Sequence, residues 1–163
     1  MGNWIRNTSP AKAATLFVCT LVGALAAGLA IYDRVVDSTP FDLTGGWTIE
    51  HEIVKTTYSP YRGLLLGYRI HLLQQGKQLT GVGEKRTENG QELPSEAFTP
   101  IRLSGTVKGR SVSGTFEEEG ARRKTSGTFF WEVSDDGNSL VGSYSSTAAS
   151  SSGPARGSRI PDG

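Results

Sequence analysis

The sequence predicts an all-β domain in which seven or eight antiparallel strands form an up-and-down meander or barrel, preceded by one transmembrane helix. Three observations lead to this prediction. A short phrase with a central glycine recurs along the chain, turn signals separate its copies, and a long uncharged segment precedes the first copy. A chain of 163 residues is long enough for one domain with appendages at its ends.

The recurring phrase usually starts with an apolar residue, continues with a small residue, glycine and a second small residue, and often ends on an apolar or aromatic one. Residues two apart in a strand lie on one face of the sheet, so each copy predicts a strand with an apolar face and a glycine within it. The copies lie at residues 43–47, 79–83, 103–107, 112–116, 125–129 and 140–144.

Two predicted hairpins fix how these strands pair. A two-residue turn at residues 109–110 places Gly105 opposite Gly114. A second turn at residues 120–121 places Gly114 opposite Gly127 and aligns an acidic run with a basic run, which attract across the strands. The sequence therefore predicts a row of glycines on the concave, apolar face, where it leaves room for a ligand or for a large aromatic side chain.

The composition excludes several function classes. The formal net charge of +1 gives no general attraction to nucleic acid, so no nucleic-acid partner is expected. The single cysteine, Cys19, lies in the uncharged N-terminal segment. The predicted domain therefore has no disulfide, zinc knuckle or cysteine nucleophile.

The uncharged segment at residues 13–32 is long enough to cross a bilayer as a helix. Arg6 and Lys12 precede it in the predicted cytoplasmic N-terminus, residues 1–12, so the positive-inside rule places the rest of the chain outside the cytoplasm. We therefore expect a single-pass signal anchor in contact with the lipid bilayer, then a linker at residues 33–42 and an extracytoplasmic domain, periplasmic in a bacterium.

Two alternatives to an uncleaved anchor stay open. The small residues Gly28 and Ala30 suit a signal-peptide cleavage site, which would give a secreted protein. The alanine- and glycine-rich composition of the segment also suits a buried helix of a soluble protein.

Residues 46–54 predict the first strand, because Trp47, His51 and two isoleucines alternate with polar residues. Trp47 is the candidate to fill the space beside the glycines. Residues 55–63 then form the longest loop, and residues 64–75 form the second strand.

The third strand runs to about residue 88, where Asn89 and Gly90 are typical of a type I′ hairpin turn. Residues 91–98 contain Pro94 and predict at most a short or edge strand.

Residues 101–133 hold three strands, residues 135–138 form a turn, and the last strand begins at residue 140. Serine, glycine, proline and arginine dominate the remainder, so residues 149–163 are predicted to be a disordered tail.

The sequence Gly-Gly-Trp at residues 45–47, followed by a meander of about eight strands, resembles the lipocalin and avidin group of ligand-binding barrels. Residues 136–144 also look like an avidin strand. The resemblance covers residues 43–148 and implies a barrel with an interior ligand site, open beside the long first loop. The chain has no lipocalin disulfide, and the biotin-binding residues of avidins are not placed on it.

Candidate catalytic and metal-binding residues are sparse. Only His51 and His71 are present, and strand alternation turns Glu50 and Glu52 away from the imidazole between them. The sequence shows no metal-ligand constellation, nucleophile elbow, phosphate loop or dinucleotide fingerprint. We therefore expect a protein that is not an enzyme and uses no cofactor.

The leading hypothesis is that the barrel binds a small apolar or amphipathic ligand in its interior. Tyr58, Tyr61 and Arg62 would guard the mouth, while His51 and Tyr68 would supply polar contacts inside. The predicted ligand-binding residues are Trp47, His51, Tyr58, Tyr61, Arg62, Tyr68, Phe129, Trp131 and Tyr144.

The alternative hypothesis is a cell-envelope interaction or structural module without a small-molecule ligand. Such a module would contact an envelope protein through an open sheet edge near Pro94, or through an apolar patch at Leu65, Leu73 and Phe130.

Overall fold

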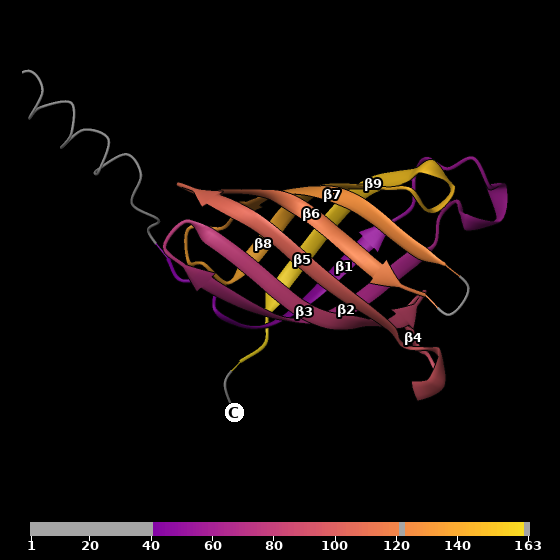
Figure 1. The fold of residues 1–163 in the computed structure, drawn as a ribbon, viewed down its shortest axis with the longest axis horizontal. Helices are drawn as coiled ribbons and strands as arrows, with labels where there is room; N and C mark the ends of the chain where they lie inside the picture. Colours follow the sequence, from indigo (N-terminus) through magenta and orange to yellow (C-terminus); the bar gives the residue numbers. More distant parts are fainter. Residues whose placement is uncertain (1–40, 121–122, 162–163) are drawn as a thin grey trace, which may run out of the picture. The chain divides into compact units, whose positions relative to one another are not determined.

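The computed structural model describes residues 41–120 and 123–161, which form a closed antiparallel β-barrel (Figure 1). The predictions for residues 1–12 and 13–32, and most of the predicted linker, lie outside the described residues. Within the described part, no helix meets the length and hydropathy that a membrane span needs.

The strands of the barrel are β1 (Gly45–Glu52), β2 (Leu65–Gln75), β3 (Gln78–Glu88), β4 (Gln91–Glu92), β5 (Thr99–Lys108), β6 (Ser111–Glu119), β7 (Lys124–Val133), β8 (Ser139–Ser146) and β9 (Ser151–Arg159). Three short 3-10 turns lie between them: η1 (Ser59–Tyr61), η2 (Ser95–Ala97) and η3 (Ala148–Ser150).

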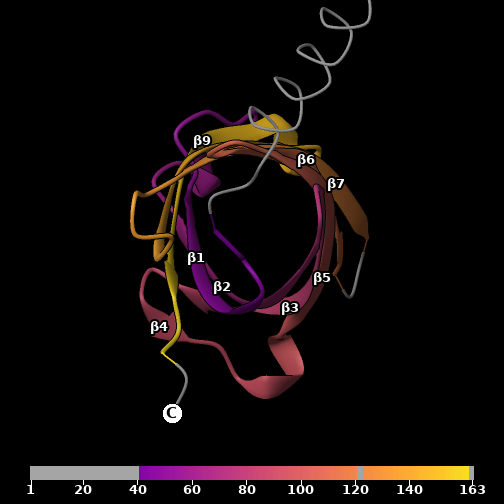
Figure 2. The same cartoon turned by 90° about the vertical axis from the view of Figure 1, so that its left-hand side faces the viewer.

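Eight of these strands form the ring, in the order β2-β1-β9-β8-β7-β6-β5-β3, and β3 pairs with β2 to close it. Figure 2 shows this ring of strands end-on. The two-residue strand β4 pairs only with the end of β3. It corresponds to the short strand predicted within residues 91–98. The all-β barrel is thus confirmed.

The ring is closed by a strand that the sequence analysis did not predict. Residues 149–163 were expected to be disordered, and that prediction is wrong for β9, which pairs with β8 on one side and β1 on the other. Small residues suit this strand because the barrel interior is crowded there: a methyl group built on Gly157 would lie 2.9 Å from a methyl carbon of Leu140. Two neighbouring strands satisfy its backbone, which composition alone does not reveal.

The predicted turn at residues 109–110 is confirmed, with Gly105 opposite Gly114 and a positive φ of 58° at Gly109. The type I′ turn is confirmed as well, because Asn89 and Gly90 have φ of 51° and 74°.

The predicted turn at residues 120–121 is wrong by two residues. Glu119 pairs with Lys124, so the connection is longer, and Gly127 faces Phe116 instead of Gly114. The shift is even, so every side chain keeps its predicted face. Its consequence is that aromatic rings, rather than further glycines, lie opposite the glycines of the neighbouring strand.

Two phenylalanine rings occupy the space beside these glycines. A methyl group built on Gly114 would lie 2.7 Å from Cζ of Phe129, and one on Gly105 would lie 3.1 Å from the same atom. The ring of Phe116 covers Gly127 in the same way. Of the two alternatives for this space, large aromatic side chains are therefore the occupants, although Trp47 is not the residue that provides them.

Trp47 instead lies in the core at the end of the barrel where the strands are joined by short turns. Its Nε1 donates to the carbonyl oxygen of Leu43 at 2.9 Å, and the guanidinium carbon of Arg159 lies 4.8 Å from its ring centroid. Arg159 also donates to the carbonyl oxygen of Thr44 at 2.7 Å. We call this the closed end; its buried side chains include Leu43, Trp47, Leu72, Leu79, Val107, Val112, Trp131, Val133 and Leu140.

Candidate ligand-binding cavity

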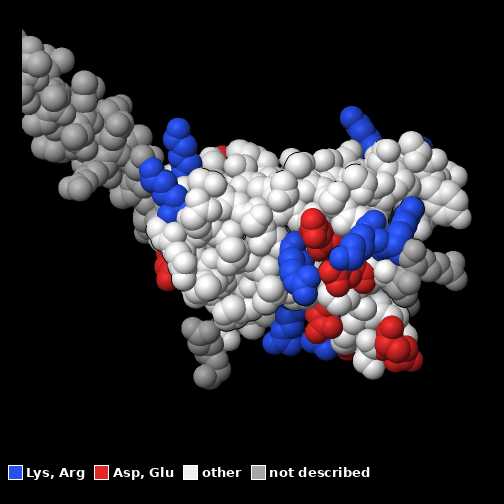
Figure 3. Space-filling view, viewed as in Figure 1, with Lys and Arg blue, Asp and Glu red and all other residues white. Residues whose placement is uncertain are grey.

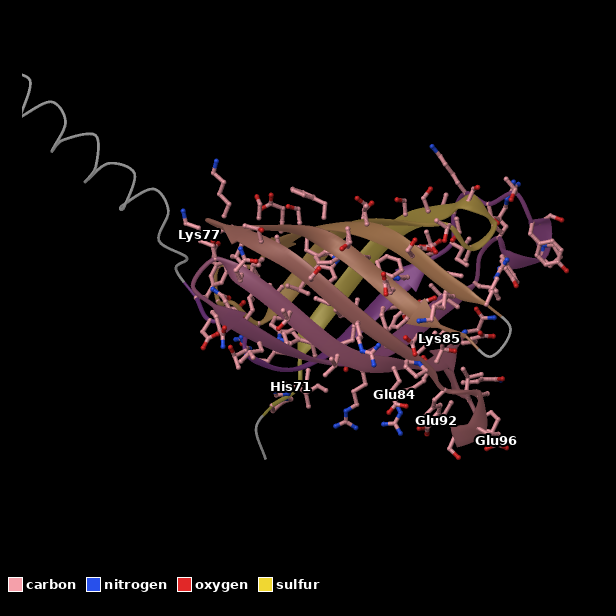
Figure 4. All side chains as sticks on the ribbon, in the orientation of Figure 1. His71, Lys77, Glu84, Lys85, Glu92 and Glu96 are labelled. Carbon is pink, nitrogen blue, oxygen red and sulfur yellow. The ribbon has the colours of Figure 1, made fainter. Side chains whose placement is uncertain are left out.

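The opposite end of the barrel holds a cavity of about 840 Å³. The longer connections meet at this open end: η1 and its flanking loop, the β4–η2 segment, the loop before β7, and η3 (Figure 1, right-hand side). Figure 4 labels Glu92 and Glu96 on the β4–η2 segment. All four connections contribute residues to the cavity lining.

The cavity exists because four of the strands carry small side chains at their inward positions near the open end. Thr99 of β5, Thr125 of β7, Ser146 of β8 and Ser151 of β9 all line it. At the closed end β5, β7 and β8 place valine, leucine and tryptophan side chains in the core. An eight-stranded barrel has an interior that large side chains just fill, so small ones leave space for a ligand.

The floor of the cavity is an aromatic cluster around His51. The imidazole stacks on the ring of Tyr144, with centroids 4.1 Å apart and planes 7° apart. The ring of Tyr68 lies 4.9 Å from it, and that of Phe116 lies 6.1 Å from it. These rings separate the cavity from the packed closed end.

His51 is buried, with 3% of its surface exposed, and neither ring nitrogen has a hydrogen-bond partner. Burial lowers the pKa of His51 to about 3, so the imidazole is neutral at physiological pH. A neutral imidazole offers one donor and one acceptor. Both are left unmet at the floor of an open cavity.

One wall of the cavity presents a carboxylate held by two hydroxyl groups. The Tyr68 hydroxyl donates to Oε1 of Glu118 at 2.6 Å, and the Thr125 hydroxyl donates to Oε2 at 3.1 Å. Burial, reinforced by the charge of Glu118, raises the pKa of Tyr68 well above 10. Burial also raises the pKa of Tyr144 to about 12, so both phenols keep their protons.

The three glutamates at positions 117–119 were expected to pair with basic residues of the same hairpin, and the structure separates them. Glu119 bonds to Arg102 and Lys124, both at 3.1 Å. Figure 3 shows Lys, Arg, Asp and Glu side chains gathered together on one face of the barrel. Glu117 is exposed on the outer face of the barrel, whereas Glu118 points into the cavity.

The mouth of the cavity is bordered by Tyr58 and Tyr61, whose rings meet edge-on at 4.8 Å. Arg62, predicted to share this role, is exposed and does not line the cavity. On the far side of the mouth, Nζ of Lys85 lies 2.6 Å from Oε1 of Glu88.

The predicted ligand-binding residues thus separate into two groups. The structure brings His51, Tyr58, Tyr61, Tyr68 and Tyr144 together around the cavity. Arg62 lies outside the lining, and Trp47, Phe129 and Trp131 are buried in the core instead.

The predicted set also left out Phe116, Glu118 and Thr125, which line the cavity. Strand alternation indicates two of them, because Phe116 and Glu118 lie two apart on the inner face of β6.

The outer apolar patch of the alternative hypothesis is not formed. Leu65 and Leu73 lie on β2 and Phe130 lies on β7, and three strands separate β2 from β7 in either direction around the ring. His71, on the outer face of β2, is exposed (Figure 4).

Comparison with protein families, characterised proteins and solved structures finds no match to this chain. The chain is a β-barrel, and no family or relative that would indicate catalysis matches it. Among residues 41–120 and 123–161, no three His, Cys, Asp or Glu side chains converge as metal ligands.

Replacing His51 by Phe should flatten the acid sensitivity of folding. The unfolded chain protonates this imidazole near pH 6.5, whereas the folded chain does so only near pH 3. In that interval the unfolded state binds more protons, so the free energy of unfolding falls as the pH falls, by up to about 1.4 kcal/mol per pH unit. Urea titrations of the wild type and His51→Phe between pH 7 and pH 4.5 measure this slope.

The control is His71→Gln, which removes an exposed imidazole and should keep the wild-type slope. The pH dependence of the free energy of unfolding is the informative quantity. A phenylalanine ring that fits poorly would lower this free energy equally at every pH and leave its slope unchanged. An unchanged slope in His51→Phe would contradict the burial of an unpaired, neutral imidazole.

Proposed function

We propose that this protein binds a small amphipathic molecule in the open half of its barrel. The apolar body of the ligand rests on the aromatic floor, and its polar part faces the wall formed by Glu118, Tyr68 and Thr125. A volume of about 840 Å³ is ample for a small organic molecule.

The observation that carries this proposal is the unpartnered imidazole of His51. Leaving a buried donor or acceptor unpaired costs roughly 1–3 kcal/mol, so native proteins rarely retain one without a purpose. Both nitrogens are buried, so a polar atom of a ligand would supply the missing partner by displacing the ring of Tyr68 or Tyr144 that covers the imidazole. A ligand that makes this hydrogen bond would bind more tightly, because it removes the cost of leaving the imidazole unpaired.

A tryptophan introduced at Thr99 tests this proposal, because Thr99 faces the cavity and its hydroxyl makes no hydrogen bond within the described chain. The probe is N-phenyl-1-naphthylamine, a neutral dye whose fluorescence rises in apolar surroundings. We expect saturable one-to-one binding to the wild type and at least a tenfold weaker affinity in Thr99→Trp, since the new ring occupies the site.

Thr106→Trp is the matched control, because Thr106 is exposed on the outer face of the same strand. It should bind the dye as the wild type does, and circular dichroism verifies that both variants fold. Equal affinities in the two variants, or no saturable binding to the wild type, would contradict the proposal.

The proposed setting is the extracytoplasmic side of a membrane, with residues 13–32 as an uncleaved anchor. The support is the uncharged length of this segment together with Arg6 and Lys12 before it. We expect the full-length protein to stay in the membrane pellet after an alkaline carbonate wash. Its release at full length would contradict the anchor, and release after loss of the N-terminal segment would indicate a cleaved signal peptide.

A further inference from the structure

The carboxylate of Glu118 lies inside the mouth of the barrel without a positive partner. Its two hydrogen bonds come from the neutral hydroxyls of Tyr68 and Thr125, which orient the carboxylate but leave its charge in place. None of the ion pairs in the described chain includes it. A half-buried, preorganised and unpaired negative charge is a feature that a ligand would complete.

None of the described basic residues around Glu118 forms an ion pair with it. Lys85 pairs with Glu88, and Lys124 pairs with Glu119. Arg123, the second basic residue of the lining, is exposed and makes no ion pair with Glu118. The charged side chains that line the cavity carry a formal charge of −1; they are Lys85, Glu88, Glu96, Glu118 and Arg123.

The floor beneath Glu118 also favours a positive ligand. The rings of Tyr68, Phe116 and Tyr144 surround the space next to the carboxylate, and aromatic faces attract cations through their quadrupoles. The imidazole among these rings is neutral at physiological pH, so it adds no opposing positive charge.

We infer that the ligand is an organic cation, an apolar or aromatic molecule with one amine or quaternary ammonium group that pairs with Glu118. This inference rests on the proposed function and names the chemical class of its ligand. An anion at the same place would face the carboxylate at short range in a partly dehydrated cavity, which is unfavourable. A neutral ligand would leave the charge of Glu118 unpaired.

A series of three naphthalene compounds that differ in charge tests the inference. The probes are 2-(2-naphthyl)ethylammonium, 2-(2-naphthyl)ethanol and 3-(2-naphthyl)propionate, titrated into the protein at pH 7 by calorimetry. We expect the ammonium compound to bind about tenfold more tightly than the alcohol, the equivalent of one charge-assisted hydrogen bond. The carboxylate compound should bind most weakly.

Glu118→Gln removes the charge but keeps an oxygen that accepts from Tyr68 or Thr125. It should remove the advantage of the ammonium compound, so that the ammonium and alcohol compounds bind to this variant with affinities within about twofold of each other. Glu117→Gln is the matched control, because it makes the same change one residue away on the outer face of β6. It should bind all three compounds as the wild type does.

The outcomes separate this inference from the proposed function. If the alcohol binds as tightly as the ammonium compound, or the carboxylate compound binds most tightly, the cation class is wrong and the binding function stands. If none of the three binds to the folded wild type, both fail. If Glu118→Gln does not fold, the affinities of the three compounds for the wild type are enough to distinguish these outcomes.

Discussion

The whole arrangement depends on aromatic rings packed against glycines inside the barrel. Phe129 covers Gly105 and Gly114, and it stacks on Trp131 with the ring centroids 4.0 Å apart. Phe116 covers Gly127 in the same manner. Because interiors are close-packed, each ring fits only where the opposite strand has no side chain. These contacts fill the barrel from the closed end up to the level of Phe116, which thereby belongs both to the core and to the floor of the cavity.

The cavity begins where this packing of aromatic rings against glycines ends. Above Phe116 the inward side chains of β5, β7, β8 and β9 are threonines and serines, which are too short to fill the space across the axis. The floor therefore keeps a buried imidazole without a hydrogen-bond partner, and the wall keeps a carboxylate without a cation. The unpartnered imidazole costs stability in the empty protein. The filled half also holds one buried donor without a partner, Nε1 of Trp131, but of these residues only His51 and Glu118 line the cavity, which connects them to a binding function.

The sequence was informative about faces and short turns, because both depend on neighbouring residues. Alternation placed His51 and Tyr68 inward, and the turn signals gave the pairing of Gly105 with Gly114. The sequence was much less informative about where each inward side chain lies along the barrel axis. Trp47 and His51 lie on the same face of β1, yet one is in the core and the other lines the cavity. That difference depends on how many bulky side chains neighbouring strands place at each level. Strand β9 was missed for a related reason, since its small residues resemble a linker until the two strands beside it are known.

The division of the barrel into a filled half and a ligand-binding half is tested most directly by nuclear magnetic resonance. Adding neutral 2-(2-naphthyl)ethanol to the isotope-labelled protein should shift side-chain signals of Tyr68, Phe116 and Tyr144 and produce contacts between their rings and the naphthalene. Signals of Val112 and Trp131 at the closed end should stay where they are. Shifts confined to the outer face, or ligand contacts that extend to Trp131, would contradict the account.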